Sequence, residues 1–456
     1  MKKTAFRPHE RGHPTQLPKE YVDWITQPIT RFLRIEAAAG AVLLFFTLVA
    51  LALSNSPWGE VFLSLWDISI GITLGSVEFE RSLQEWVNDA FMTLFFFLVA
   101  LELKREIVLG ELKNPRLAML SISGALGGML VPALIYLAFL QGQPGQNGWG
   151  IVMATDTAFV IACLILLGPR VPKSLRIFML SLAIIDDIGA IVVVAVGYGE
   201  NISFYYIGLA VIGFIAVRVM AALGIRSIAV YSLMGGLIWL AVDASGVHPT
   251  VTGVILGLMT PTGRWVNEER LLTIMECVVP LPLANQHDVN VNDRQILKTA
   301  EAAAREALSP LERLEMLLHP WVGFVIMPLF AFAFANAGVV ISFSEQSGSL
   351  YMAIFAGLVI GKPVGIILFS GLATYTKLAV RPPDLSWLYL AAGGMLAGIG
   401  FTMSLFIAHL ALSPALVDVA KLGILSASLF SALAGIILLS WLIKRDGLRK
   451  KGKASR

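Results

Sequence analysis

The chain repeatedly presents stretches of about 20 mainly apolar residues, the length that an α-helix needs to cross the hydrocarbon core of a bilayer. These stretches predict an all-α polytopic membrane protein with twelve spans. The composition agrees, because 57% of the 456 residues are hydrophobic and 14% are charged, against about 25% charged residues in soluble proteins. The predicted spans are residues 35–54, 85–103, 117–140, 149–168, 177–198, 203–222, 227–243, 247–260, 317–340, 349–371, 385–411 and 416–443.

The positions of Lys and Arg set the predicted orientation, because cytoplasmic loops retain these residues. With residue 1 inside, 31 of the 34 Lys and Arg residues lie inside, Arg81 lies outside, and Lys362 and Lys421 fall within spans. Miscounting one early span would move every later loop to the other side and destroy this asymmetry. The predicted regions are a cytoplasmic N-terminal tail (1–34), a membrane domain (35–443) and a basic cytoplasmic C-terminal tail (444–456).

Several classes of protein find no support in the composition. Residues 1–34 lack the apolar stretch of a secretory signal, so they are expected to stay attached, as a solvated tail or as a regulatory one. The net charge of +3 is small and the basic residues form short clusters, so no nucleic-acid partner is expected. Cys163 and Cys277 match neither a disulfide framework nor a metal-site spacing, and no cofactor is predicted.

Residues 55–84 and 264–313 depart from the pattern of spans. Polar and apolar residues alternate between 66 and 80 on either side of Gly75, which predicts a small external β-hairpin. Its exposed edge would allow a homodimer to form through residues 66–80, although the hairpin could instead lie on its own domain. The polar segment 264–313 is predicted to be a cytoplasmic loop with one surface helix between Asp293 and Leu308.

Charged residues lie within several predicted spans, where an isolated charge costs about 2.5–3.5 kcal/mol or more. Asp156 lies in the fourth span, Asp186 and Asp187 are adjacent in the fifth, and Lys362 lies deep in the tenth. Such residues are functional candidates by default. Lys421 near the external end of the last span is instead expected to form a structural pair with Asp418 and to reach the interface.

The aspartate doublet has the chemistry of a cation exchanger. Adjacent helical residues point about 100° apart, so Asp186 and Asp187 can meet a cation pathway and a counter-charge respectively, or the reverse. Hard alkali cations prefer carboxylate, hydroxyl and carbonyl oxygens, and protons compete for the same oxygens. Lys362 can supply the counter-charge, or it can pair with an aspartate only to hold helices together. Asp156 can be a helix cap, which does not exclude contact with an ion.

Helix-breaking residues occur at matching places in the fourth and eleventh spans. Thr155-Asp156-Thr157 interrupts one, and glycines between Gly393 and Gly400 interrupt the other, unless those glycines serve close packing. Each is the middle of a triplet, spans 3–5 and 10–12, and the two triplets run in opposite directions. Inverted repeats with interrupted helices are typical of secondary transporters. Asp156 and Lys362 have signs suited to neutralise the half-helix dipoles.

Several strings of residues also occur in the order of one known family. They are Asn88-Asp89, Leu101-Glu102-Leu103-Lys104-Arg105-Glu106, Ala154-Thr155-Asp156, Ala183 to Ile191 around Asp186-Asp187, Ser245-Gly246-Val247-His248, His319-Pro320-Trp321-Val322, Phe330-Ala331-Phe332 and Gly361-Lys362-Pro363. Through them the chain resembles the NhaA-type Na+/H+ antiporters over residues 30 to 445 or so. That family is itself a standard example of inverted-repeat transporters, so the repeat is not an independent prediction.

The resemblance implies an electrogenic antiporter of the bacterial inner membrane that exports Na+ or Li+ while a larger number of protons enters. It implies that Asp187 and Asp156, with Thr155, contact the cation. Asp186 would pair with Lys362, and Asp186 and Asp187 would carry the exchanged protons. Sodium and pH homeostasis would be the physiological role.

The resemblance further implies activation at alkaline pH. The candidate residues for this response are Glu102, Glu106, His248, Glu315 and His319. Among them only the histidines have an ordinary pKa near neutrality, but His319 could simply begin a helix and His248 could be a packed polar residue. Segment 264–313 and the N-terminal tail are longer than expected for the family, which bears on the pH profile and leaves the ion site intact.

Other functions fit less well. An intramembrane aspartyl protease needs a Gly-x-Gly-Asp string and a prenyltransferase needs spaced Asp clusters, and the sequence has neither. A cation channel would need a ring of carboxylates or carbonyls rather than inverted, broken helices. A symporter for an organic solute is the closest alternative.

Overall fold

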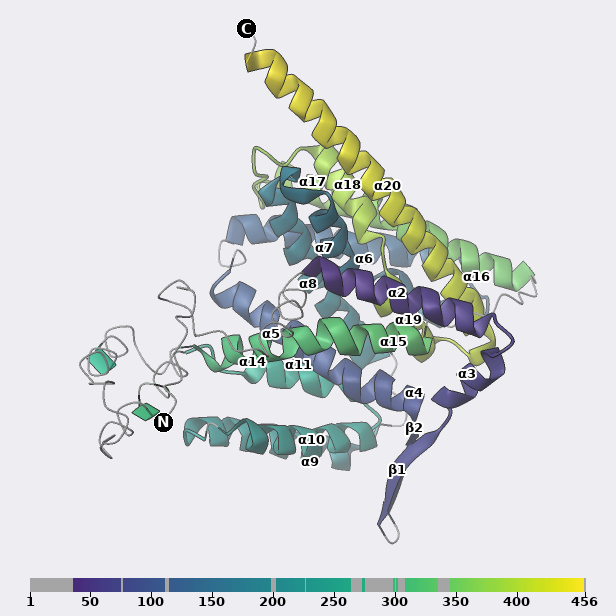
Figure 1. Cartoon of the computed structure of the whole chain (residues 1–456), viewed down its shortest axis with the longest axis vertical. Coiled ribbons are helices and arrows are strands. Elements are labelled where there is room, and N and C mark those ends of the chain that lie inside the picture. The colour runs from purple at the N-terminus through teal and green to yellow at the C-terminus, as the bar shows by residue number, and fades with distance from the viewer. Residues whose placement is uncertain are drawn as a thin grey trace, which may run out of the picture.

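The computed structural model describes residues 36–74, 77–110, 115–197, 202–225, 227–263, 273–274, 298–299, 301, 308–334 and 345–454. These residues form a helical protein with one two-stranded sheet (Figure 1). The predicted tail 1–34 lies outside the described residues, as do most of the predicted loop 264–313 and nearly all of its predicted helix.

Within the described part of the chain, eight helical segments are long and apolar enough to cross a membrane. They are Leu83–Val108, Ala118–Phe139, Gln146–Leu166, Lys173–Ala195, Phe204–Ala222, Pro310–Phe334, Gly348–Tyr375 and Pro414–Asp446. Two bent pairs raise the number to ten if each counts as one span: α2 (Glu36–Ser54) with α3 (Gly59–Trp66), at 119°, and α18 (Trp387–Ala397) with α19 (Phe401–Ala411), at 48°. The chain is therefore an integral membrane protein.

The remaining elements follow in two groups. The first group comprises α4 (Leu83–Trp86), the π-helix η1 (Val87–Phe91), α5 (Met92–Val108), α6 (Pro115–Phe139), the 3-10 helix η3 (Gln146–Val152), α7 (Thr157–Leu166), the 3-10 helix η4 (Gly168–Arg170), α8 (Lys173–Gly197), α9 (Phe204–Ala222), α10 (Ile228–Ala244) and α11 (Thr250–Met259). The second group comprises α14 (Pro310–Trp321), the π-helix η5 (Val322–Ile326), α15 (Met327–Phe334), α16 (Glu345–Ala356), the π-helix η6 (Gly357–Gly361), α17 (Lys362–Tyr375) and α20 (Pro414–Ala454). The apolar helices α10 and α11 are too short to be counted among the eight.

Local sequence signals explain where several helices begin. Ser82 starts α4 and Ser309 starts α14, each with a glutamate three residues later that completes a capping box. Such a box satisfies two backbone N–H groups that would otherwise lack partners at the helix end. Ser386 caps α18 in the simpler way, by accepting a hydrogen bond from the Tyr389 N–H.

Helices α6 and α17 cross at unusually close range. A Cβ atom on Gly127 would lie 2.1 Å from the carbonyl oxygen of Gly365, and the reverse holds for Gly365. Small residues at such a crossing let two membrane helices approach backbone to backbone. The crossing fixes the start of α17, and with it Lys362, against the centre of the helical body.

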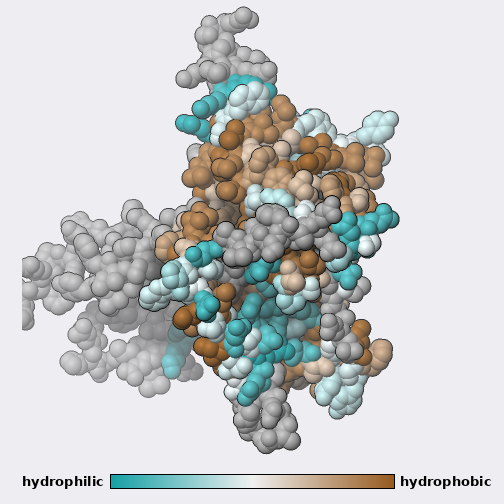
Figure 2. All heavy atoms as spheres, turned by 90° about the vertical axis from the view of Figure 1, so that its right-hand side faces the viewer, coloured by the Kyte–Doolittle hydropathy of each residue, from teal (hydrophilic) through white to brown (hydrophobic). Residues whose placement is uncertain are grey.

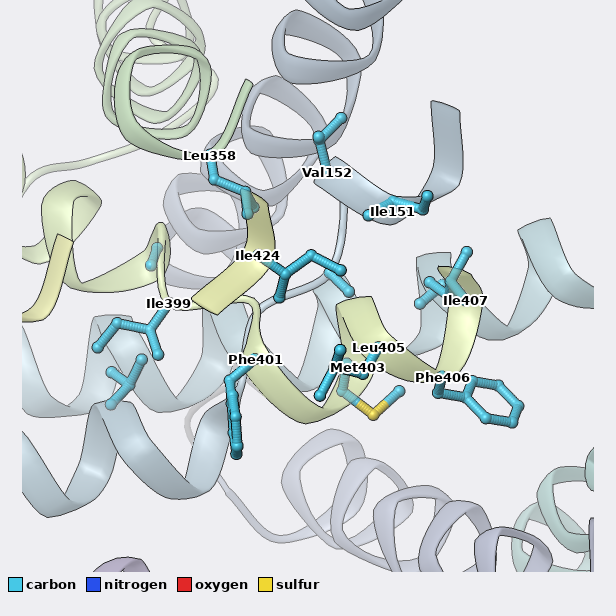
Figure 3. Close-up of a cluster of buried hydrophobic side chains, with 14 of the residues drawn as sticks. Ile151, Val152, Leu358, Ile399, Phe401, Met403, Leu405, Phe406, Ile407 and Ile424 are labelled. Carbon is cyan, nitrogen blue, oxygen red and sulfur yellow. The ribbon is translucent and has the colours of Figure 1, made fainter. Parts of the chain in front are cut away.

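An apolar cluster encloses the break between α18 and α19 (Figure 3). Labelled side chains come from η3, η6, α19 and α20, and they include Val152, Leu358, Phe406 and Ile424, which are all buried. Dense packing of this kind keeps water away from the break, and it raises the free-energy cost of any unpaired charge there.

The predicted β-hairpin is confirmed. Strands β1 (Ser69–Leu74) and β2 (Val77–Ser82) pair antiparallel, and they project from the helical body (Figure 1). The alternating pattern predicts a hairpin that begins at Trp66, and it gives no sign of α3. Trp66 instead ends α3 and is buried by edge contacts with the rings of Phe62 and Phe332. Burial of Trp66 against these two rings thus outweighs the preference for a strand that the alternating pattern indicates.

Figure 2 views the side of the molecule that carries the hairpin and α3. Hydrophobic residues cover most of the upper half, and hydrophilic residues gather mainly below them. At the C-terminal end α20 continues as one helix to Ala454 and extends beyond the other helices (Figure 1).

Candidate functional site

Two interrupted helices meet in the middle of the bundle. One interruption lies between η3 and α7, and the other lies between α18 and α19. The Asp156 N–H donates to the Ile399 carbonyl at 2.6 Å, and the Ser404 hydroxyl donates to the Ile151 carbonyl at 2.7 Å. The backbone groups freed at one break are thus satisfied partly by the other, as buried polar groups in a membrane require.

Asp156 lies at the N-termini of two helices at once. Its Oδ1 accepts from the Phe159 N–H of α7 at 3.2 Å. Its Oδ2 accepts from the N–H and the hydroxyl of Thr402 in α19, at 3.1 and 2.5 Å. The positive ends of two helix dipoles therefore face one buried carboxylate, which is the stabilising arrangement for both. The structure thus gives Asp156 the capping role that the sequence analysis left open.

Lys362 is the matching cation. Its side chain is fully buried, and its ammonium donates to Asp186 Oδ2 and to Thr155 Oγ1, both at 2.7 Å, and to the Met153 carbonyl. Met153 is the C-terminal capping residue of η3, where a helix dipole is negative. Three acceptors use all three protons of the ammonium group.

Thr155 joins Lys362 to Asp186. Its hydroxyl accepts from Lys362 and lies 2.7 Å from Asp186 Oδ2 and 3.0 Å from the Ala397 carbonyl. A hydroxyl has one proton to donate, so Thr155 can donate to only one of these two acceptors at a time.

Asp187 differs from its neighbour Asp186. Its Oδ2 accepts from the Thr157 hydroxyl at 3.1 Å, and its Oδ1 is buried without a hydrogen-bond partner among the described residues. No Lys, Arg or His of the described chain forms an ion pair with it, and its residue is only 2% exposed. Asp187 is therefore the buried carboxylate whose charge has the least compensation.

Four of the five predicted pH-response residues gather between α5 and α14. Arg105 forms an ion pair with Glu315 and lies 3.6 Å from Glu106, and His319 Nδ1 lies 3.5 Å from Glu102 Oε1. Glu102, Glu106 and Glu315 are largely shielded, whereas the His319 side chain is half exposed. These residues form what we call the α5–α14 cluster: Glu102, Arg105, Glu106, Glu315 and His319.

The structure does not bring His248 to the α5–α14 cluster. It lies between α10 and α11, with Nδ1 2.8 Å from the Thr250 hydroxyl and Nε2 3.6 Å from Asp89. Asp89 pairs with Arg81, and the same guanidinium contacts both carboxylate oxygens of Asp243 at 2.5 and 2.6 Å. This second charged group was not predicted from the sequence, although the isolated external Arg81 was a signal for it.

Comparison with known proteins agrees with this geometry. A family model described as Na+/H+ antiporter 1 matches residues 30–439. The chain belongs to this family. It is 57% identical over 432 residues to the Na(+)/H(+) antiporter NhaA 2 of Vibrio vulnificus, a match that covers 95% of this chain and 96% of the relative. It is 55% identical over 428 residues to the Na(+)/H(+) antiporter NhaA of Rhizobium meliloti, covering 94% of this chain and 98% of the relative.

Membership fixes the general activity. Members of the Na+/H+ antiporter family are transporters that exchange sodium ions for protons, so the chain is a sodium/proton antiporter and not an enzyme. Na+ and H+ are its transported ions. The resemblance that the sequence strings indicated is thereby confirmed.

Proposed function

We propose that this antiporter exchanges Na+ or Li+ for protons at Asp187 and Asp186, where the two interrupted helices meet. The observation that carries this proposal is the buried Asp187 carboxylate, which has no ion pair and one unpartnered oxygen within the described chain. An ionised carboxylate in such a place is costly unless a cation or a proton compensates it. Na+ and H+ need the same oxygens, so binding of either one displaces the other.

Asp186 and Lys362 act as the second proton-exchanging unit. In the structure the ammonium compensates Asp186, so the pair can remain ionised while Asp187 holds a cation. When protons bind to both Asp186 and Asp187, more positive charge moves inward than one cation carries outward. Exchange by these two carboxylates is therefore electrogenic, and a membrane potential that is negative inside drives it.

Asp156 and Thr155 complete the cation site only after a local rearrangement. The oxygens of Asp156 already accept three hydrogen bonds, and the Thr155 hydroxyl is engaged by Lys362 and Asp186. A cation that reaches Asp156 needs the Thr402 hydroxyl to rotate away, and one that reaches Thr155 needs Lys362 to move. These two residues are assigned as ligands on the family resemblance and on their position at the interruption, where Thr155 contacts the aspartate doublet through Asp186.

The α5–α14 cluster is proposed to regulate exchange by pH. It lies on the side that the Lys and Arg distribution assigns to the cytoplasm. A change in the charge of this cluster would reach the ion site, because α5, which carries Glu102, packs against α8, which carries Asp187. Deprotonation in this cluster at alkaline pH would alter the field at the ion site. His248 would act separately, through Asp89.

The proposed architecture is a twelve-span protein of the bacterial inner membrane, with cytoplasmic termini and inverted repeats in spans 3–5 and 10–12. The eight long helical segments, the two bent pairs, and α10 and α11 support this number. Interruptions in the middle element of each triplet support the repeat. Membrane lipid would surround the apolar helices, and a homodimer would form through the hairpin at residues 66–80.

A vesicle assay tests the ion site. With an imposed pH gradient, Na+ should dequench a pH-sensitive dye in vesicles that contain the parent protein. Asp187→Ala should abolish this response, and Asp418→Ala should retain it because Asp418 is exposed and lies outside the site. Equal activity in the two variants would reject the site assignment.

Proton release from the detergent-solubilised protein tests competition directly. Adding Na+ or Li+ should release protons, and the amount should depend on pH because the two ions share oxygens. Cation affinity that stays constant across pH would reject shared occupancy. Stimulation of flux by an organic solute would favour the symporter alternative.

A further inference from the structure

Two threonines flank Asp156, and each one contacts one member of the aspartate doublet. Thr155 Oγ1 lies 2.7 Å from Asp186 Oδ2, and Thr157 Oγ1 lies 3.1 Å from Asp187 Oδ2. Both hydroxyls come from the same interruption, on either side of the residue that caps α7. The break in the fourth span thus presents one hydroxyl to each carboxylate.

The two hydroxyls differ in how fully they are used. Thr155 accepts from Lys362 and has two acceptors for its proton. Within the described part of the chain, the Thr157 hydroxyl has the Asp187 contact and no other hydrogen bond. That contact is also longer than the usual 2.7–2.8 Å or so for O–H···O. Thr157 therefore keeps its lone pairs free, next to a carboxylate whose other oxygen, Oδ1, has no partner among the described residues.

We infer that Thr157 is a further cation-contacting residue that sets affinity and selectivity at Asp187, an inference that rests on the proposed ion site. In the cation-free state its hydroxyl donates to Asp187. When Na+ binds, the hydroxyl rotates, and its lone pair and the Asp187 carboxylate both face the cation. No covalent bond changes and no backbone movement is required, because rotation about the Cβ–Oγ1 bond turns the proton away while Oγ1 stays beside Asp187.

This assignment gives the antiporter an oxygen ligand that costs little to recruit. Cation contact at Thr155 requires Lys362 to release it, and contact at Asp156 requires Thr402 to release it. Among the described residues, Thr157 has only its long bond to Asp187 to give up, and the cation replaces that bond. The number of oxygens matters for selectivity, since the smaller Li+ is satisfied by fewer oxygens than Na+.

The test compares Thr157→Val with Thr157→Ser in proteoliposomes at fixed pH. Valine keeps the branched shape and removes the hydroxyl, whereas serine keeps the hydroxyl. Thr157→Val should raise the apparent KM for Na+ about tenfold, the change that corresponds to roughly 1.4 kcal/mol, with the maximal rate retained at saturating Na+. Thr157→Ser should keep the parent KM, and the KM for Li+ should rise less than that for Na+ in the valine variant.

Matched controls separate this role from a structural one. Thr374→Val removes a hydroxyl that bonds carbonyls within α17, so it should leave both KM values unchanged. A parent-like KM in Thr157→Val would overturn the inference, as would equal losses in the serine and valine variants. Equal KM increases for Na+ and Li+ together with a lower Tm would also overturn it, because they indicate a packing role.

The same vesicles distinguish the inference from the function on which it rests. If Asp187→Ala loses exchange while Thr157→Val is unaffected, only the role of Thr157 fails. If Asp187→Ala retains exchange, the proposed ion site itself fails.

Discussion

The crossing of the interrupted helices and the α5–α14 cluster use the same kinds of charged residue in opposite surroundings. At the crossing, Asp186 and Lys362 have no exposed side-chain surface and their charges are held by fixed hydrogen bonds. In the α5–α14 cluster, Arg105 and His319 have side chains that are 36% and 51% exposed, so water shares the work of solvating the charges. Loss of one charged group where the interrupted helices meet is therefore expected to abolish exchange. Loss of one charged group in the α5–α14 cluster is expected to change only the pH profile of exchange.

The largest effect on exchange is expected at Asp187. Asp187→Asn keeps the shape and an oxygen that can accept from Thr157, but it removes the charge that we propose binds a cation or a proton. Exchange should fall at least about a hundredfold, which corresponds to roughly 2.7 kcal/mol, while the protein remains folded. Dye dequenching in vesicles measures the rate, and a thermal melt in detergent checks the fold. Near-normal exchange would show that the region where the interrupted helices meet tolerates the loss of a charged group, as the α5–α14 cluster is expected to do.

The next effect concerns stability. Lys362→Met leaves Asp186 buried without its cation, and breaking a buried pair from one side costs about 3–5 kcal/mol. The loss should appear as a lower Tm in detergent. Replacing both partners, as in Asp186→Asn with Lys362→Met, should recover most of that stability and leave exchange impaired. If the double variant is no more stable than Lys362→Met, then the unpaired charge of Asp186 does not account for the lower Tm of Lys362→Met.

The two regions differ in how much of their structure could be predicted from the sequence. The helical spans and the hairpin follow from hydrophobic length and alternation, which are local properties. Asp156 capping α19 could not be predicted, because its partner Thr402 lies 246 positions along the chain. The short helix α3 was also not predicted, because its formation depends on the packing of Trp66 against Phe332, which is distant in the sequence.

The signals for the α5–α14 cluster were weaker still. Arg105 and Glu315 lie 210 positions apart, and no spacing rule connects them. The resemblance to the NhaA family, rather than the residues themselves, singled out Glu102, Glu106, Glu315 and His319. That resemblance grouped His248 with them, and the structure places His248 beside Asp89 instead.

A smaller effect is expected in the α5–α14 cluster. Arg105→Gln removes the positive charge that forms an ion pair with Glu315, so the Glu315 carboxyl group releases its proton less readily. If deprotonation activates exchange, the pH of half-maximal activity should move upward. The shift should be roughly 0.2–0.7 pH unit, since a partly exposed pair contributes about 0.2–1 kcal/mol and 1.36 kcal/mol equals one unit.

The measurement is the exchange rate at saturating Na+ across pH, in vesicles. The maximal rate should stay close to that of the parent protein, because within the described residues Arg105 has no contact with the proposed ion site. A downward shift would contradict the proposed sign. A lost maximal rate with an unchanged pH profile would assign Arg105 to transport instead of regulation.

The smallest effect is expected at the last span, where an exposed carboxylate meets a buried amine. Asp418 Oδ1 lies 3.4 Å from Lys421 Nζ, but the Asp418 side chain is 65% exposed while that of Lys421 is 7% exposed. Water screens such a pair, so Asp418→Asn should change stability by less than about 1 kcal/mol. Exchange and the pH profile should both remain at parent values. A Tm loss as large as that of Lys362→Met would mean that burial of one partner alone decides the cost of breaking an ion pair. Exposure of the other partner to water would then not weaken the pair, contrary to the comparison drawn between the two regions.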